Sequence, residues 1–254
     1  MASEKDIRKS EKSTSVEENS VVDDAVRKYL PYLQEIQRKL ITILIVIVAS
    51  AVLGFIFYQQ ILTFIMSLFN LKGITIIMSS PYQYIDLAIN TALATGVVIA
   101  FPLLIYYLLS FLKPALATKE YRLVSRLVPV AVVLFVIGFG FGAWVMQFVI
   151  NMYSQTANVF NVTNMWDISR FFSQTIIMGL CLALMFELPV VLTILIRLKV
   201  VKRETIAKHR RVAYAIIVVV AALLPPNDVI SLSILTLAPV FLFELALLLN
   251  KAII

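Results

Sequence analysis

Two acidic residues of this chain occupy positions where carboxylates are costly or unusual. Glu187 stands in the apolar stretch FELPVVLTIL, about ten residues or roughly 15 Å of helix before the basic residue Arg197. An ionisable group at that depth in a bilayer costs about 2.5 kcal/mol or more, so it should face protein or water and not lipid. Pro189 removes a backbone donor two residues later, which predicts a bend that opens space beside the acid. The alternative role for Glu187 is structural, as a protonated side chain that hydrogen-bonds a neighbouring helix.

Asp228 follows a Pro-Pro-Asn stretch that begins at Pro225 and separates two apolar runs. Its side chain is well placed to accept from the free N–H groups of a helix that begins at Val229. The preceding run, residues 212–224, provides only about 20 Å of helix, which is well short of a hydrocarbon core about 30 Å thick. We therefore expect Asp228 and Pro225 to be recessed within the membrane.

Two further carboxylates, Glu35 and Glu120, lie in polar stretches beside apolar runs. Glu35 shares a face of a predicted amphipathic helix, YLPYLQEIQRKL, with Arg38 and Lys39. Glu120 lies among four basic residues in SFLKPALATKEYRLVSRL. Each acid can form a solvated local ion pair, which contributes little. The two can instead receive a cationic ligand such as a paired-arginine peptide, because guanidinium and carboxylate match in a bidentate geometry.

The elements that must hold these residues are membrane-spanning helices. The chain has 254 residues, of which 61% are hydrophobic and only 15% charged, whereas soluble domains carry about 25% charged residues. Most of its apolar runs approach the roughly 20 residues that span a bilayer. The runs predict an all-α membrane protein with six transmembrane helices, at residues 40–58, 87–109, 127–150, 173–196, 212–224 and 229–249.

Basic residues fix the expected orientation. If successive helices cross the membrane in opposite directions, 20 of the 22 Lys and Arg residues lie on one side of the membrane. The positive-inside rule places that side, and with it both termini, in the cytoplasm. Residues 1–26 are charged, rich in serine and without periodicity, so we expect a polar, disordered tail followed by one membrane domain at 27–254. Attraction to anionic lipid heads explains the net charge of +7 without invoking nucleic acid.

Other motifs restrict the function. The run IGFGFGAW contains a GxxxG spacing, Gly138 to Gly142, which predicts close approach of another helix. Cys181 is the only cysteine and His209 the only histidine, which argues against a disulfide and against a metal site. No phosphate-binding loop or dinucleotide fingerprint is present. We expect no cofactor and no catalysis, and infer that the work is done with partners or the membrane potential.

Five stretches in this order resemble the TatC family, the multispanning receptor subunits of the twin-arginine protein translocase. YLQEIQRKL resembles the family pattern HLxELRxRL, and FPLLIYYLLSFLKPALATKEYRL resembles its second helix and following loop. SSPYQYI resembles the entry to that helix, while FELPV and LLPPNDVISLSILTLAPVFLFEL resemble the fourth to sixth helices. Tyr32 replaces the usual histidine, and Gln37 and Lys39 stand where the pattern has arginines.

The resemblance implies a receptor for folded precursors whose signal peptides carry consecutive arginines. It assigns Glu35 and Glu120, with Phe111 and Arg122, to signal-peptide binding. It assigns an intramembrane polar surface for single-span TatA-type or TatB-type partners to four residues, Glu187, Pro189, Pro225 and Asp228. It also implies that the last two helices are short, and that the complex contains several copies and uses the proton gradient.

Two rival functions are compatible with the same residues. A small proton-coupled transporter would use Glu187 and Asp228 as relay groups. A purely structural scaffold would tolerate replacement of Glu35, Glu120 and Glu187 by glutamine.

Overall fold

The computed structural model describes residues 34–35, 37–69, 74–112, 125–160, 163, 165–225 and 228–252. The chain forms two units, Met1–Ile45 and Val46–Ile254, which we describe separately. The described part of the first unit is helical, and Lys39 Nζ lies 2.7 Å from Glu35 Oε1 one turn earlier. The predicted tail at 1–26 lies outside the described residues.

Helices long and apolar enough to cross a bilayer account for five of the six predicted spans. Within the described residues they are Gln37–Ile56, Gln83–Leu108, Leu127–Ala157, Ile168–Arg197 and Val229–Lys251. The predicted span at 212–224 corresponds to α9 (Arg210–Ala222), whose 13 residues are too few to cross unaided.

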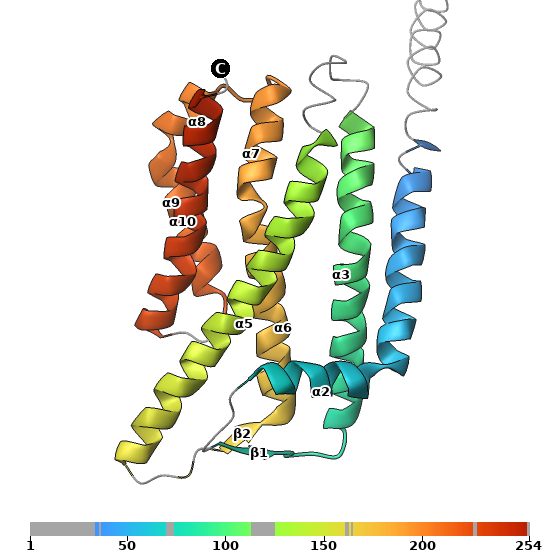
Figure 1. The fold of residues 1–254 in the computed structure, drawn as a ribbon, viewed down its shortest axis with the longest axis vertical. Coiled ribbons are helices and arrows are strands. Elements are labelled where there is room, and N and C mark those ends of the chain that lie inside the picture. Colours follow the sequence, from blue (N-terminus) through green and yellow to red (C-terminus); the bar gives the residue numbers. More distant parts are fainter. Residues whose placement is uncertain are drawn as a thin grey trace, which may run out of the picture. The chain divides into compact units, whose positions relative to one another are not determined.

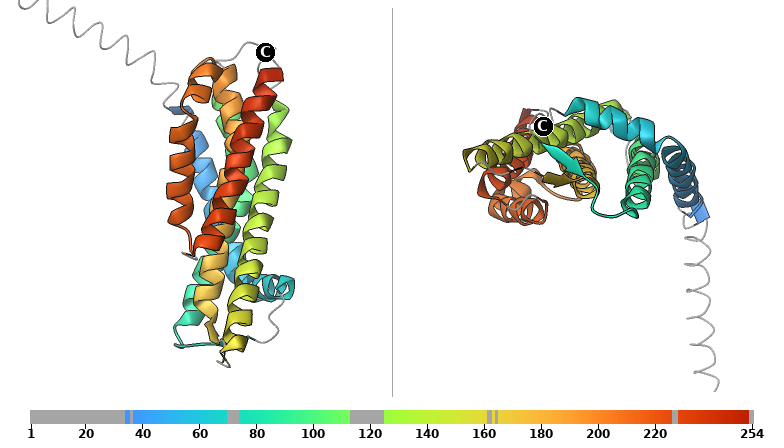
Figure 2. Two further views of the ribbon diagram at one scale, coloured as in Figure 1. Left: turned by 90° about the vertical axis from the view of Figure 1, so that its left-hand side faces the viewer. Right: turned by 90° about the horizontal axis from the view of Figure 1, so that it is seen from below.

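The last helix is not short, contrary to the prediction. The helix α10 (Val229–Ala252) has 24 residues and lies side by side with α9, as Figure 1 and Figure 2 show. It continues past the apolar run because Lys251, in its last turn, interacts favourably with the negative end of the helix. Only α9 of the final pair is therefore short.

The fourth predicted span is interrupted in its middle. It consists of α6 (Ile168–Phe186) and α7 (Leu188–Arg197), with Glu187 between them and Pro189 at the start of α7. Pro189 cannot donate a backbone hydrogen bond, so the regular ladder stops where the sequence predicted a bend. The helix is thus broken beside the acid.

A two-stranded parallel sheet lies outside the all-helical prediction. The strand β1 (Thr75–Ile77) pairs in parallel with β2 (Met165–Asp167), with Ile76 opposite Trp166. These strands lead into α3 (Gln83–Leu112) and α6, and the short helix α2 (Tyr58–Leu68) lies across this end of the second unit in Figure 1. The stretch 59–86 between the first two predicted spans therefore contains a helix and a strand.

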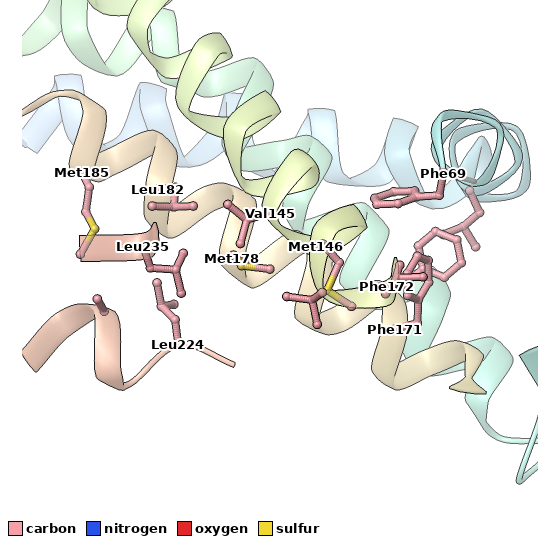
Figure 3. Packing of buried hydrophobic residues seen from close by; sticks show 14 of the residues in the cluster. Phe69, Val145, Met146, Phe171, Phe172, Met178, Leu182, Met185, Leu224 and Leu235 are labelled. Atoms are coloured by element: carbon pink, nitrogen blue, oxygen red, sulfur yellow. The ribbon is translucent and has the colours of Figure 1, made fainter. Parts of the chain in front are cut away.

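Packing between α6 and α5 (Leu127–Val159) forms the centre of the second unit. Phe69 meets Phe171 edge to face at 5.2 Å, and Phe172 packs against Phe171 at the same separation. Figure 3 shows this aromatic group continuing into a row of aliphatic and Met side chains that reaches Leu224 and Leu235. The row connects the sheet end of α6 with the turn between α9 and α10.

Two glycines let the backbones of α5 and α6 touch, as the GxxxG spacing predicted. A Cβ added at Gly138 would lie 2.7 Å from Ala183 Cα, and one added at Gly142 would lie 2.6 Å from Gly179 Cα. Gly140, on another face of α5, has no such neighbour within 4 Å. Close packing of small residues contributes to helix association in lipid, where the hydrophobic effect does not drive helices together.

Candidate functional site

Glu187 is buried at the break between α6 and α7. Its residue is only 5% exposed, and neither carboxyl oxygen has a hydrogen-bond partner among the described residues. Pro189 is buried beside it in the first turn of α7. A buried polar group without a partner costs about 1–3 kcal/mol, so its retention needs a reason other than folding. The carboxyl group lies beneath the surface of this chain, and no described neighbour supplies the hydrogen bond that a purely structural role would require.

Asp228 caps α10 as the sequence predicted. Its Oδ1 accepts from the backbone N–H of Ser231 at 2.8 Å, and its Oδ2 lies 3.5 Å from the Tyr153 hydroxyl of α5. Asp228 and Pro225 are both half-buried. The Tyr153 contact lies six residues, or roughly 9 Å, before the end of α5 at Val159. Figure 1 accordingly shows α9 and α10 reaching only part of the way along α5.

Glu187 and Asp228 do not form a relay within the described residues. No hydrogen bond joins Glu187 to Asp228 there, and the partners of Asp228 are Tyr153 and the backbone of its own helix. Leu224, next to the turn, does belong to the same apolar cluster as Met185, next to Glu187. Apolar packing, and not a chain of proton carriers, connects the two places.

The predicted signal-peptide residues are described only in part. Glu35 is 61% exposed in its side chain, and Lys39 is its ion-pair partner. Phe111 lies in the last turn of α3. Glu120 and Arg122 lie outside the described residues, so the proximity of the four residues remains a prediction.

A polar cluster around Asp167 was not predicted. Its Oδ2 accepts from Ser79 Oγ at 2.5 Å and from Gln83 Nε2 at 2.6 Å, and its Oδ1 accepts from the Arg170 N–H at 3.1 Å. The hydrogen bond from Ser79, followed by that from Gln83, lowers the pKa of Asp167 to about 2. An Asp directly before the apolar helix at Ile168 is a recognisable signal for the start of a helix. Nothing in the sequence near it, however, indicates that Ser79 and Gln83 are its partners.

A second unpredicted cluster joins α9 to α10. The Tyr214 hydroxyl donates to Glu244 Oε1, and Arg210 Nε lies 3.6 Å from the same oxygen. Glu244 of α10 is thus held by two residues of α9, which fixes the short helix against its long neighbour.

These features define a polytopic helical membrane protein with a buried acid at a helix break and a half-buried acid at the turn between its last two helices. The sequence profile of "Sec-independent protein translocase protein (TatC)" matches residues 31–238, so the chain belongs to the TatC family. Members of this family are protein translocase components and not catalytic enzymes.

Individual relatives agree with this assignment. The chain is 26% identical over 224 residues to the Sec-independent protein translocase protein TatCy of Bacillus subtilis, covering 88% of each. It is 30% identical over 237 residues to TatC of Halothiobacillus neapolitanus, covering 91% of this chain and 64% of that protein. A crystal structure of the twin-arginine translocase receptor TatC has the same fold, with a TM-score of 0.76 at 24% identity, covering 87% of this chain and 98% of that one.

Proposed function

We propose that this chain is the receptor of a twin-arginine translocase, binding precursor signal peptides at its basic face and organising single-span partners in the membrane. The observation that carries the proposal is the family match over residues 31–238, which includes Glu35, Phe111, Glu120 and Arg122. Transport of folded cargo is then driven by the membrane potential or proton gradient.

The charge distribution supports reception on the cytoplasmic side. The strong bias of Lys and Arg places Glu35 and Glu120 together on the side where precursors are made, with both termini. Glu35 is exposed, and its ion pair with Lys39 joins neighbouring turns of one helix. Such pairs contribute about 0.3–0.5 kcal/mol, so a bidentate arginine can displace the lysine at little cost.

The intramembrane acid supports a role in partner docking. Glu187 is buried without a described partner, and the turn at Pro225 and Asp228 is recessed. Because the carboxyl oxygens of Glu187 lie beneath the surface of this chain, a single-span helix would bring a polar side chain to them when α6 and α7 separate at the break, and would then satisfy the carboxyl group in a medium without water. The same helix would cover the exposed side chains of the short helix α9, which include Val212, Ile216 and Val219.

Charge reversal tests the signal-peptide site. Glu35→Lys and Glu120→Lys should each reduce crosslinking of the translocase to a twin-arginine precursor by about tenfold, since a hydrogen bond to a charged group contributes about 1.5 kcal/mol or more. Glu204→Lys, a matched reversal on the same basic side, should leave crosslinking unchanged. Unchanged crosslinking in both test variants would refute the assignment of these acids, and equal loss in all three would show a general charge effect.

A further inference from the structure

A basic cleft lies where the second half of the fourth span and the last helix end. It has a volume of about 510 Å³, and its lining includes Lys199, Lys202, Arg203, Glu204, Asn250 and Lys251. These residues come from the segment after α7, the short helix α8 (Arg203–Lys208) and the last turn of α10. The volume is within the range of small-molecule sites.

The side chains that line this cleft have a net positive charge. Four of the six named residues are cations and one is an acid. Within the described part of the chain, Lys199, Lys202 and Lys251 form no ion pair. Four like charges around one cavity repel one another, so an anion bound there would relieve the repulsion.

Hydrogen bonds keep the walls of the cleft in place. Arg203 Nε donates to the Leu247 carbonyl of α10 at 3.1 Å, which leaves the terminal nitrogens of its guanidinium available. Asn250 Nδ2 donates to Thr193 Oγ1 of α7 at 2.9 Å and to the Ala246 carbonyl at 2.8 Å. The basic groups are therefore carried by a connected scaffold of α7, α8 and α10.

One cation of the lining, Lys199, has a strained backbone conformation. Lys199 has φ 57°, in the left-handed region, and is the only non-glycine residue with a positive φ in the described part of the chain. It ends α7 in a Schellman motif, in which the N–H groups of Lys199 and Val200 donate to the carbonyls of Ile196 and Leu195. Glycine is the usual residue at this position because it adopts the conformation without strain. A strained lysine in place of glycine indicates that its side chain is needed.

The level of the cleft in the membrane favours a lipid over a soluble anion. Two spans end beside it, at Arg197 and Lys251, which is the depth of the headgroups. Apolar side chains are exposed next to it, with Val200 66%, Leu248 60% and Leu249 50% exposed. An anion at this place can keep its phosphate among the cations while its acyl chains cover those apolar residues.

We propose that this cleft binds the phosphate headgroup of an anionic phospholipid, such as phosphatidylglycerol, from the leaflet at the basic face of the protein. Basic pockets between transmembrane helices are suited to such headgroups, with a contribution from each nearby Lys or Arg. The lipid would bridge α7 and α10 at their ends. This binding is separate from signal-peptide reception and does not depend on the proposed function.

The test measures binding of phosphatidylglycerol to the purified full chain in neutral detergent, by native mass spectrometry. Phosphatidylcholine and inorganic phosphate are the comparison ligands. Lys199→Gly and Lys202→Gln should each weaken phosphatidylglycerol binding about fivefold. Lys208→Gln, which removes an exposed charge from the same short helix outside the cleft, should leave binding unchanged. Lys199→Gly should fold at least as stably as the wild type, because glycine relieves the strain.

Each other outcome would overturn the proposal. Equal loss of binding in Lys208→Gln would show general charge attraction, and unchanged binding in Lys199→Gly would show that the strained lysine has no role in lipid binding. Inorganic phosphate binding as tightly as phosphatidylglycerol would identify a soluble anion as the ligand. Binding of an acidic peptide that phosphatidylglycerol does not displace would assign the cleft to a protein partner.

Discussion

Substitution of Gly142 by alanine provides the sharpest test of how α5 and α6 are held together. The new Cβ would lie 2.6 Å from Gly179 Cα, 2.9 Å from Gly179 N and 3.2 Å from the Met178 carbonyl carbon. Carbon atoms prefer about 3.5–4.0 Å, and the obstructing atoms are backbone, so the helices must separate by about 1 Å. Overpacking of this kind costs about 1–3 kcal/mol.

Gly140→Ala is the matched control, because a Cβ there meets nothing within 4 Å. Both substitutions gain the same helix propensity, about 1 kcal/mol, so the difference between the variants isolates the clash. We expect Gly142→Ala to be less stable than Gly140→Ala by about 1–3 kcal/mol. The assay is unfolding by sodium dodecyl sulfate in mixed micelles, followed by the fluorescence of Trp144 and Trp166. Equal stability of the two variants would refute the reasoning that backbone contact at Gly142 positions α6.

Two further substitutions test the buried and outer acids. Glu187→Met should raise the free energy of unfolding by about 1–3 kcal/mol, because it removes a buried carboxyl group without a described partner. The same substitution should lower export of a twin-arginine precursor. Unchanged export would show that this acid has no functional role. Asp167→Asn should lower the thermal midpoint at pH 7. Because the folded pKa of Asp167 is about 2, below its ordinary value of 3.8, the stabilisation is complete above about pH 5 and is lost as the pH falls toward 2. The difference from wild type should therefore shrink between pH 4 and pH 2, and a difference independent of pH would show that the carboxylate charge has no part.

The sequence predicts much of the membrane architecture because hydrophobic length and small-residue spacing are local properties. Five apolar runs correspond to candidate spans, and the run at 212–224 is a short helix as expected. Pro189 and Gly142 also act as their residue types predict, by interrupting a helix and by admitting a neighbour. In each case one segment of sequence contains the physical cause.

The contacts that the sequence did not predict join distant segments. Ser79 and Asp167 are 88 positions apart, and the strands β1 and β2 near them have only three residues each, too few for a periodic pattern. Glu244 and its partner Tyr214 are likewise 30 positions apart, on two different helices. The sequence predicted that Glu187 faces protein or water and not lipid, but its burial within the chain depends on how α6 and α7 pack.

The pairing of β1 with β2 has a mechanical consequence. The strand β2 leads directly into α6, and β1 leads into the parallel helix α3 after residues 78–82, so the beginnings of these two helices are held by the strand hydrogen bonds and by Asp167. If α3 tilts away from α6, the end held by the strands stays in place and the opposite end moves. The helix α3 has 30 residues, about 45 Å, so a tilt of about 10° would move its far end by about 8 Å while leaving the strands paired. Displacement would then be largest at the opposite end of α3, near Leu112.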